Sequence, residues 1–217
     1  MTIPVFQNSS RLHELGVEHG FGTCRSEDAL VSRLVTPKQV HGKTLARVPS
    51  RDPELEADAL WSDEPGVAVG IVTADCVPLL LVSMECRTVA AVHAGWRGSA
   101  ARIGHSVVTE LARASGTDPS SFVGVLGPHI GPCCYEVDQP VRRLIPDASV
   151  FSPSRRPGHY MLDLFELNRL QLVQAGLRED GIERVGGCTA CETGLYHSYR
   201  RDGRSHRMVH WIRVPEA

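Results

Sequence analysis

The sequence predicts a single α/β domain in which helices pack on a mixed β-sheet. Three observations support this prediction. Short apolar runs bounded by polar or turn-forming residues indicate buried strands. Two longer segments carry apolar side chains at every third or fourth position, which is typical of amphipathic helices. A length of 217 residues without an internal repeat suits one domain, and we expect residues 1–217 to form it.

The expected strands lie in the first half of the chain and just beyond it. Residues 67–72, 77–82 and 88–92 are apolar and closely spaced, so we expect them to be adjacent strands of one buried sheet. Residues 121–126 form another such run.

The first expected helix covers residues 97–114, where positions 100, 103, 107, 111 and 114 are apolar. Gly116 follows it, and glycine is the commonest residue just after a helix. The second helix covers residues 163–175, because Asp163 is a good N-cap with Glu166 three residues later.

Two segments near the C-terminus indicate turns. The stretch SPSRRPG at residues 152–158 is the only linker-like segment, and its shortness favours a loop over a domain boundary. The dipeptide Asp202-Gly203 predicts a tight hairpin turn in the tail.

Composition limits the functional classes. The net charge is −2 and like charges form no block, which does not favour nucleic acid as a partner. The apolar runs are far too short to span a bilayer, so we expect no membrane partner. The start, MTIPVFQNSSRLHELG, lacks the basic residues and apolar core of a signal peptide, and we expect a cytoplasmic protein. Seven cysteines, an odd number, argue for thiols, ligands or core residues instead of a disulfide scaffold.

Three stretches place chemically active residues at the ends of predicted strands. PKQVHG contains His41, TADC contains Asp75 and Cys76, and VHAGWRG contains His93. Two histidines and one thiolate suit zinc, and three protein ligands leave a fourth position open, as in catalytic zinc sites. Spacing alone is weak evidence, since single buried Cys and His residues are more often packing or hydrogen-bonded groups.

Two further clusters lie nearby in the sequence. In HAGWRG, Arg97 at an expected helix start predicts an anion site, with a solvated arginine beside a glycine turn as the alternative. In GPHIGPCCYEV, a rigid loop carries His129 and the pair Cys133-Cys134. Adjacent cysteines generally point apart, but with Cys188 and Cys191 a four-thiolate zinc site is a further possibility.

Taken together, several motifs resemble the YfiH-like family in content and order. They are KQVHG, DALWSDEPGVAVGIVTADCVPLLL, AVHAGWRG, GPHIGPCCYEV, YMLDLFELNRLQLVQAG and SYRRDGR, and the resemblance covers about residues 19–214. This family has been labelled purine nucleoside phosphorylase, multicopper polyphenol oxidase (laccase) and peptidoglycan editing factor. The resemblance implies an α/β fold and a zinc ion held by His41, Cys76 and His93.

The resemblance also implies a reaction. The family acts on adenosine, inosine and methylthioadenosine by phosphorolysis, with inorganic phosphate as co-substrate, and deaminates some adenosine. One bacterial branch is linked to removing a wrong amino acid from a cell-wall precursor. Family members often have H-G-F-x-T-R near the start of the chain, whereas this chain has Cys24 at the arginine position and Arg25 one place later.

Four functional hypotheses follow. The first is a zinc-dependent purine nucleoside enzyme, in which Asp75 or Glu136 carries protons, Arg97 and Arg25 bind phosphate, and His129 contacts the base. The second is an amidase acting on a peptidoglycan precursor, with Cys76 as nucleophile and His93 as its base.

The third hypothesis is copper-dependent oxidation of phenols, because a His₂Cys set also suits copper, although the chain contains no His-x-His pair. The fourth is a partner-binding domain without catalysis. The sequence leaves the oligomeric state open, a homodimer included.

Overall fold

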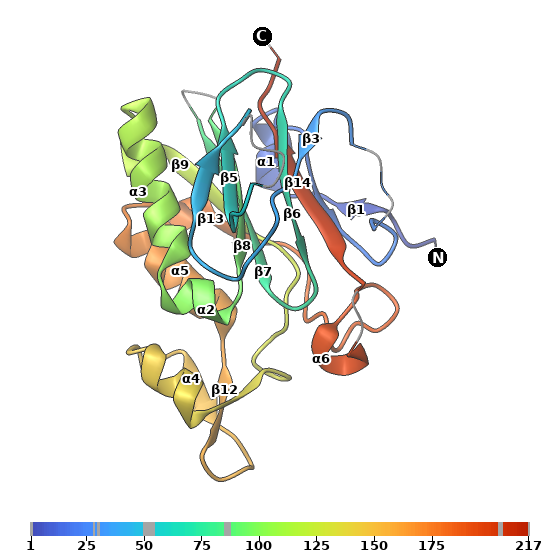
Figure 1. Ribbon diagram of the computed structural model, residues 1–217, viewed down its shortest axis with the longest axis vertical. Coiled ribbons are helices and arrows are strands. Elements are labelled where there is room, and N and C mark those ends of the chain that lie inside the picture. Colours follow the sequence, from blue (N-terminus) through green and yellow to red (C-terminus); the bar gives the residue numbers. More distant parts are fainter. Residues whose placement is uncertain are drawn as a thin grey trace.

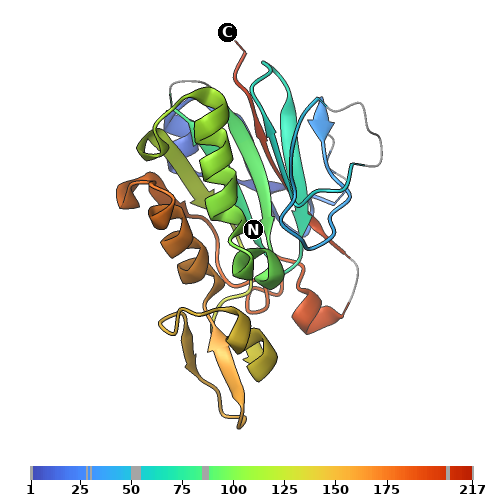
Figure 2. The ribbon, with the colours of Figure 1, turned by 60° about the vertical axis from the view of Figure 1, so that its left-hand side comes forward.

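The computed structural model describes residues 2–27, 29, 31–49, 55–84, 88–203 and 206–216. Three layers stack on one another (Figures 1 and 2): helices, a six-stranded sheet and a five-stranded sheet. Both sheets mix parallel and antiparallel neighbours. The predicted α/β class with mixed pairing and packed helices is therefore confirmed.

The six-stranded sheet is the central layer and carries the site described below. Its order is β13 (Ile182–Arg184), β9 (Phe122–Leu126), β7 (Val77–Ser83), β8 (Val89–Ala94), β5 (Ala59–Ser62) and β4 (Leu45–Arg47). In β7, Leu79 and Leu81 belong to the core beneath the helices, whereas Leu80 and Val82 belong to the core between the sheets. Alternate side chains of a strand point to opposite faces, so a strand buried on both faces is apolar throughout.

The five-stranded sheet has the order β1 (Phe6–Gln7), β2 (His19–Gly22), β14 (Met208–Arg213), β6 (Ala68–Thr73) and β3 (Leu34–Val35). The prediction that residues 67–72, 77–82 and 88–92 are neighbours in one sheet was wrong in one respect, because β6 belongs to this second sheet. The chain crosses from β6 to β7 through a short turn in which Asp75 has a φ of 85°. Strand spacing along the sequence does not reveal such a crossing.

A buried histidine ties three strands of the five-stranded sheet together. His210 of β14 accepts a hydrogen bond at Nδ1 from the backbone N–H of Gly22 (3.1 Å), and its Nε2 lies 2.9 Å from Oγ1 of Thr73. Because Nδ1 is an acceptor, the ring is neutral and Nε2 carries the proton. Complete burial lowers the pKa of His210 to about 3.

The helices are α1 (Ser10–Glu14), α2 (Trp96–Ala100), α3 (Ile103–Ser115), α4 (Gln139–Leu144), α5 (Leu164–Gln174) and α6 (Tyr199–Asp202), with 3₁₀ turns at Pro119–Ser121 and Glu179–Gly181. The single helix predicted over residues 97–114 is in fact two, because Arg102 adopts a left-handed conformation with φ 61° between α2 and α3. Gly116 ends α3 as expected, and Asp163 caps α5 by accepting from the N–H of Glu166 at 3.0 Å.

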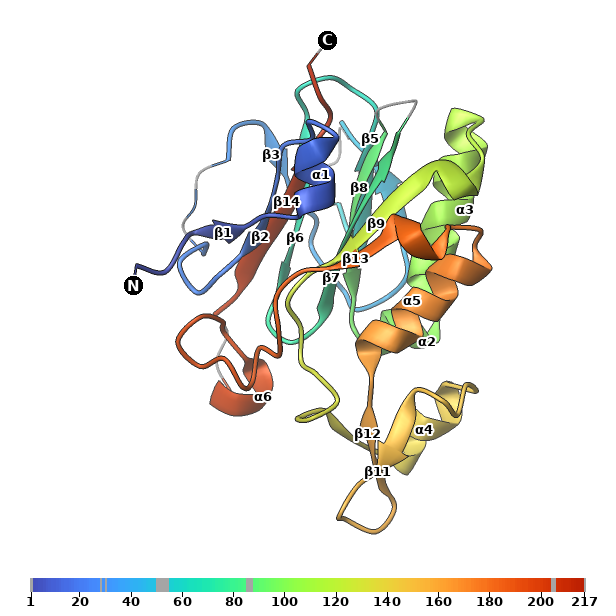
Figure 3. The ribbon, with the colours of Figure 1, turned by 180° about the vertical axis from the view of Figure 1, so that it is seen from behind.

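A small three-stranded sheet projects beyond the layers together with α4 (Figure 3). Its strands are β10 (Glu136–Asp138), β12 (His159–Leu162) and β11 (Phe151–Pro153). The predicted loop at residues 152–158 starts inside β11 and is the connection of its hairpin. The hairpin predicted at Asp202-Gly203 was wrong, since Gly203 (φ 58°) terminates α6 instead. Within the described residues, no helix has the length and apolarity needed to cross a membrane.

Candidate metal centre

Strand pairing brings Cys76 and His93 to one edge of the six-stranded sheet. Strands β7 and β8 are antiparallel, with Val77 opposite Ala94 and Pro78 opposite His93. Cys76 directly precedes β7, so the start of one strand lies beside the end of the other. His41 joins them from the segment between β3 and β4, and its ring centroid is 4.7 Å from that of His93. One potential ligand atom from each of the three residues lies within 4.8 Å of the other two.

The buried carboxylate of Asp58 holds both histidines in place. Asp58 directly precedes β5, which pairs with β8. Its Oδ1 accepts from Nδ1 of His93 at 2.8 Å and from the backbone N–H of His41 at 2.9 Å. Its Oδ2 accepts from the N–H of Gly42 at 2.6 Å. Nδ1 of His93 is thus committed to Asp58 and Nε2 is left for a ligand, as in the carboxylate–histidine pairs of metal sites.

The backbone leaves no room for an extra carbon beside these groups. A Cβ at Gly95 would lie 2.9 Å from Sγ of Cys76 and 3.6 Å from Nε2 of His93. Contacts below 3.0 Å force a displacement, so glycine at this position is what allows the thiol and the imidazole to converge.

The protonation equilibria favour a thiolate at this position. Burial acts to raise the pKa of Cys76, but hydrogen bonds to His41 and His93 outweigh it and lower that pKa to about 7. Burial acts to lower the pKa of His93, whereas Asp58 and Cys76 raise it to about 9. A thiolate and two imidazoles are ligands that zinc and copper both accept, so the donor set fits a bound transition-metal ion.

An open pocket of about 670 Å³ surrounds these three side chains. Its lining consists of Gln39, His41, Val72, Thr73, Ala74, Asp75, Cys76, His93, Trp96, Arg97, Tyr135, Tyr199, Arg200 and Arg207. The arginines come from α2, α6 and the segment before β14; α2 and α6 both lie in the lower half of Figure 1.

Each of the three guanidinium groups lies over an aromatic ring of the lining. The ring centroid of Trp96 is 4.4 Å from the guanidinium carbon of Arg97, that of Tyr135 is 5.1 Å from Arg200, and that of Tyr199 is 5.9 Å from Arg207. Cation–π contacts of this kind orient a guanidinium group without neutralising its charge. The pocket therefore combines a candidate metal site with a concentration of positive charge.

Asp75 lies at the pocket, but both of its carboxylate oxygens are occupied. Oδ1 accepts from the hydroxyl of Thr189 and Oδ2 from the backbone N–H of Arg200, each at 2.6 Å. The side chain links the β6–β7 turn to two segments more than 100 residues away in the sequence. This geometry suits a group that positions the pocket wall.

Three residues expected at the site, Glu136, Arg25 and His129, do not line the pocket. The carboxylate of Glu136 is turned to Ser154 and to Arg156 (3.2 Å) in the small sheet. The guanidinium of Arg25 donates to the carbonyl of Ile3 at 2.9 Å on the surface. The structure does not bring either residue to His41, Cys76 and His93.

His129 likewise does not line the pocket. Its side chain is fully buried and its ring is stacked on that of Phe165. Its Nδ1 donates to the carbonyl of Gly127 at 2.7 Å, and burial lowers its pKa to about 4. Its packing is that of a core residue.

Several residues that form or support the site were not predicted. Asp58 begins the motif DALWS, and an acid directly before an apolar strand was the available signal. Tyr135 adjoins the cysteine pair, and Arg200 lies in SYRRDGR. Periodicity and spacing do not reveal that these segments meet, because the contacts join elements distant in the sequence.

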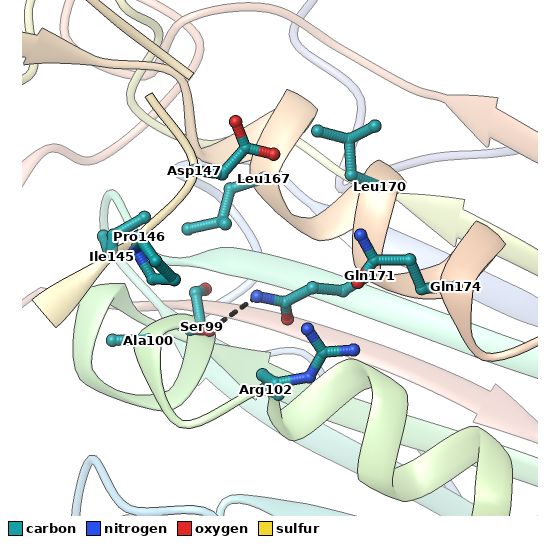
Figure 4. Close-up of a pocket in the computed structure, with 10 residues that line it drawn as sticks. All are labelled: Ser99, Ala100, Arg102, Ile145, Pro146, Asp147, Leu167, Leu170, Gln171 and Gln174. Carbon is teal, nitrogen blue, oxygen red and sulfur yellow. Dashed lines mark hydrogen bonds between the residues drawn. The ribbon is translucent and has the colours of Figure 1, made fainter. Parts of the chain in front are cut away.

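A second cavity, of about 110 Å³, lies between α2, α5 and the loop after α4 (Figure 4). It shares no residue with the metal pocket. The amide of Gln171 donates to the backbone carbonyl of Ser99 at 2.8 Å, and Leu167 and Leu170 are among the lining residues (Figure 4). Its lining has no His, Cys or Glu and offers no ligand set for a metal.

Comparison with known proteins identifies the family. The family model described as multi-copper polyphenol oxidoreductase laccase matches residues 16–215. The chain belongs to this family. A solved member, YlmD from Geobacillus stearothermophilus, has a TM-score of 0.85 at 30% identity, over 98% of this chain and 99% of that chain. A second solved structure, of the hypothetical protein YfiH from Bacillus licheniformis, has a TM-score of 0.83 at 29% identity, over 92% of this chain and 93% of that chain. It confirms the resemblance to YfiH-like proteins.

Similar proteins carry names that state an activity, among them a phosphorylase and a deaminase. The purine nucleoside phosphorylase YlmD of Geobacillus stearothermophilus is 37% identical over 198 residues, which is 84% of this chain and 72% of that protein. The adenosine deaminase RL5 of an unknown prokaryotic organism is 34% identical over 187 residues, which is 78% of this chain and 70% of that protein.

Proposed function

We propose that this chain is a zinc-dependent purine nucleoside phosphorylase that also deaminates adenosine. Relatives named for both activities support an enzyme that acts on purine nucleosides. The observation that carries the proposal is a single pocket in which His41, Cys76 and His93 face three guanidinium groups and three aromatic rings. A nucleoside and a phosphate need an aromatic surface and a cationic surface side by side.

Phosphate binding is assigned to Arg97 and Arg200. Among the described residues, neither forms an ion pair with a carboxylate, so both retain their charge for a ligand. Guanidinium groups bind phosphate oxygens through paired N–H donors. Asp75 fixes the backbone of Arg200, and we assign it a positioning role in place of proton transfer.

In phosphorolysis, an oxygen of the bound phosphate attacks C1′ of the ribose, and the bond from C1′ to the purine nitrogen breaks. The two arginines hold the anion at the sugar, which supplies the orientation on which such a displacement depends. The rings of Tyr135 and Tyr199 provide flat surfaces on which the purine stacks.

His41, Cys76 and His93 are the residues that would hold zinc. A zinc ion there would supply Lewis acidity, which is the chemistry that deamination needs, because water replaces the amino group at C6 of adenine and ammonia leaves. Zinc is proposed over copper because the chain has no His-x-His pair from which a multicopper centre is built. Asp58 fixes the orientation of His93 and the backbone of His41, and so keeps the donor set assembled.

The test is a product assay. Zinc-loaded protein is incubated with adenosine, with and without inorganic phosphate, and adenine, ribose 1-phosphate and inosine are quantified. Adenine and ribose 1-phosphate that form only with phosphate support phosphorolysis, and inosine formed in both conditions supports deamination. Absence of all three products would refute the proposal.

A second candidate function is amide hydrolysis by a cysteine nucleophile. It is favoured by the chain of contacts from Cys76 to His93 and from Nδ1 of His93 to Asp58, which resembles a nucleophile–base–orienting group arrangement. His41 has no role in that arrangement. A His41→Ala variant that hydrolyses peptidoglycan precursors without metal would favour this function over the first.

The state of the cysteines favours a reducing compartment. The six described cysteines are free thiols, and such thiols persist where disulfides do not form. We therefore propose that the protein acts in the cytoplasm.

A further inference from the structure

A second group of ligating side chains lies outside the pocket. The sulfur atoms of Cys133, Cys134, Cys188 and Cys191 all lie within 4.8 Å of one another. Sγ of Cys191 is 3.6 Å from that of Cys133 and 3.4 Å from that of Cys134. These distances are far longer than a disulfide bond of about 2.05 Å. We propose that the four thiolates bind one structural zinc ion, independently of the pocket.

The distances between the sulfur atoms match the size of a zinc–thiolate tetrahedron. A Zn–S bond of about 2.3 Å gives edges of about 3.8 Å between sulfur atoms. The separations of 3.4 and 3.6 Å are close to that edge. The other sulfur pairs lie within 4.8 Å of each other, so they would have to approach by at most about 1 Å. Sulfur atoms that ligate an iron–sulfur cluster surround several atoms and lie farther apart, so the spacing favours a single ion.

The backbone around Cys188 is arranged for an anionic sulfur. Cys188-Thr-Ala-Cys191 is a C-x-x-C turn, closed by the N–H of Cys191 donating to the carbonyl of Cys188 at 3.1 Å. Sγ of Cys188 accepts from the N–H of Gly131 at 3.2 Å, and the nearby N–H groups of Ala190 and Cys191 also favour its ionised form. Backbone N–H groups that converge on one sulfur stabilise its thiolate form, which is the form that binds metal.

A tight turn overcomes the tendency of adjacent cysteines to point apart. The carbonyl of Gly131 accepts from the N–H groups of both Cys134 and Tyr135 at 3.0 Å. This curls the chain so that both neighbouring sulfur atoms approach Cys191. A Cβ at Gly131 would lie 3.3 Å from Sγ of Cys133 and 3.3 Å from Cβ of Cys188, so glycine allows the two loops to close on the cluster.

The cluster joins the loop that follows β9 to the loop that follows β13. An isolated bridge between His129 and Cys188 already aligns these loops. Both contribute to the pocket wall: Tyr135 lines the pocket next to Cys134, and Thr189 within the C-x-x-C turn donates to Asp75. Four thiolates leave no open coordination position on the ion, so it would hold the two loops of the pocket wall together and take no part in catalysis.

The decisive experiment counts zinc on folded protein by native mass spectrometry, in a Cys76→Ala background that removes the pocket site. We expect one zinc per chain in Cys76→Ala and none in Cys76→Ala/Cys191→Ser. The matched control is Cys76→Ala/Cys24→Ser, since Cys24 is a half-buried cysteine outside the cluster, and it should retain one zinc. This count does not depend on the proposed enzymatic activity.

Two readouts guard against misfolding of the variants. Chelation of zinc from the Cys76→Ala protein should lower its Tm by at least about 5 °C, whereas Cys76→Ala/Cys191→Ser should show no further change with chelator. Cobalt loaded in place of zinc should give thiolate-to-metal charge-transfer bands in Cys76→Ala that the double variant lacks. The proposal is overturned by Cys76→Ala protein without zinc, by zinc retained in Cys76→Ala/Cys191→Ser, by iron in place of zinc, or by masses that reveal disulfides.

Discussion

Replacing Asp58 by asparagine probes the metal centre without touching a ligand. The carboxylate is fully buried and accepts three hydrogen bonds, from Nδ1 of His93 and from the N–H groups of His41 and Gly42. An amide has one oxygen and one NH₂ group, so in either orientation Asp58→Asn sets an N–H donor against another donor. Either the His93 contact or the Gly42 contact is lost, together with the negative charge.

The expected loss follows from these contacts. A group that orients a metal-ligating histidine typically contributes a factor of about 10 to 100 in metal affinity. This corresponds to about 1.4–2.7 kcal/mol, comparable with one charge-assisted hydrogen bond lost in a buried site. We therefore expect Asp58→Asn to raise the zinc Kd of the pocket by about 10- to 100-fold.

The assay is competition for zinc against a chromophoric chelator, with thermal unfolding as the check on the fold. The control is Asp63→Asn, an equally conservative change at a half-exposed residue whose partner is Arg47 at 2.7 Å. An exposed pair contributes about 0–1 kcal/mol, so the zinc Kd of the control should equal that of the parent. An Asp58→Asn protein that binds pocket zinc as tightly as Asp63→Asn would refute the assigned role of Asp58.

Three further predictions concern the same structure. Gly95→Ala places a Cβ 2.9 Å from the sulfur of Cys76 and should weaken zinc binding in the pocket at least about tenfold. The control Gly194→Ala adds a Cβ that meets no atom within 4 Å and should bind zinc like the parent. Equal zinc affinities of the two variants would contradict the packing argument. The pKa of His210 is about 3 in the folded protein and about 6.5 when unfolded, so the unfolded chain binds more protons below pH 6.5 and stability falls on acidification. At pH 5 this effect lowers the free energy of unfolding by about 2 kcal/mol. Urea denaturation at pH 7 and pH 5 should therefore show a smaller loss of stability on acidification for His210→Asn than for the parent. An equal loss in both proteins would contradict the assignment to His210. Arg97→Met should raise the KM for phosphate at least about tenfold while the zinc content stays unchanged. The surface control Arg156→Met should have the phosphate KM of the parent. An unchanged phosphate KM in Arg97→Met would exclude Arg97 from phosphate binding.

Much of the fold could be predicted because the relevant signals are local. The apolar runs that became β7, β8 and β9 bury both faces and are read directly from composition. The Asp163 cap and the Gly116 stop depend on hydrogen bonds and backbone angles within a few residues. The assignment of β6 to the second sheet depends on distant pairing with β14, which no local pattern encodes.

The sequence likewise predicted some residues of the candidate site and missed others. Cys76 and His93 were expected together because successive strands meet at one sheet edge, and the register of β7 and β8 brings them there. Glu136 was expected at the site as a proton carrier, but it lies in strand β10 and its carboxylate contacts Arg156 in the small sheet. Asp58 was missed because its partners lie about 17 and 35 residues away and only the folded chain unites them.

The four cysteines show a further limit of sequence reasoning. Adjacency of Cys133 and Cys134 argued against a shared metal ion, since side chains of neighbouring residues generally diverge. The turn closed on the carbonyl of Gly131 reverses that expectation, and its geometry becomes visible only in the folded chain.

The most direct test of the central claim follows ribose 1-phosphate formation from adenosine and phosphate while zinc is added back to metal-free protein. We predict that activity rises in proportion to zinc bound at the pocket, and that Cys76→Ala and His41→Ala remain inactive at every zinc concentration. Full activity in metal-free protein, or in either variant, would contradict the claim that His41, Cys76 and His93 form the catalytic metal site.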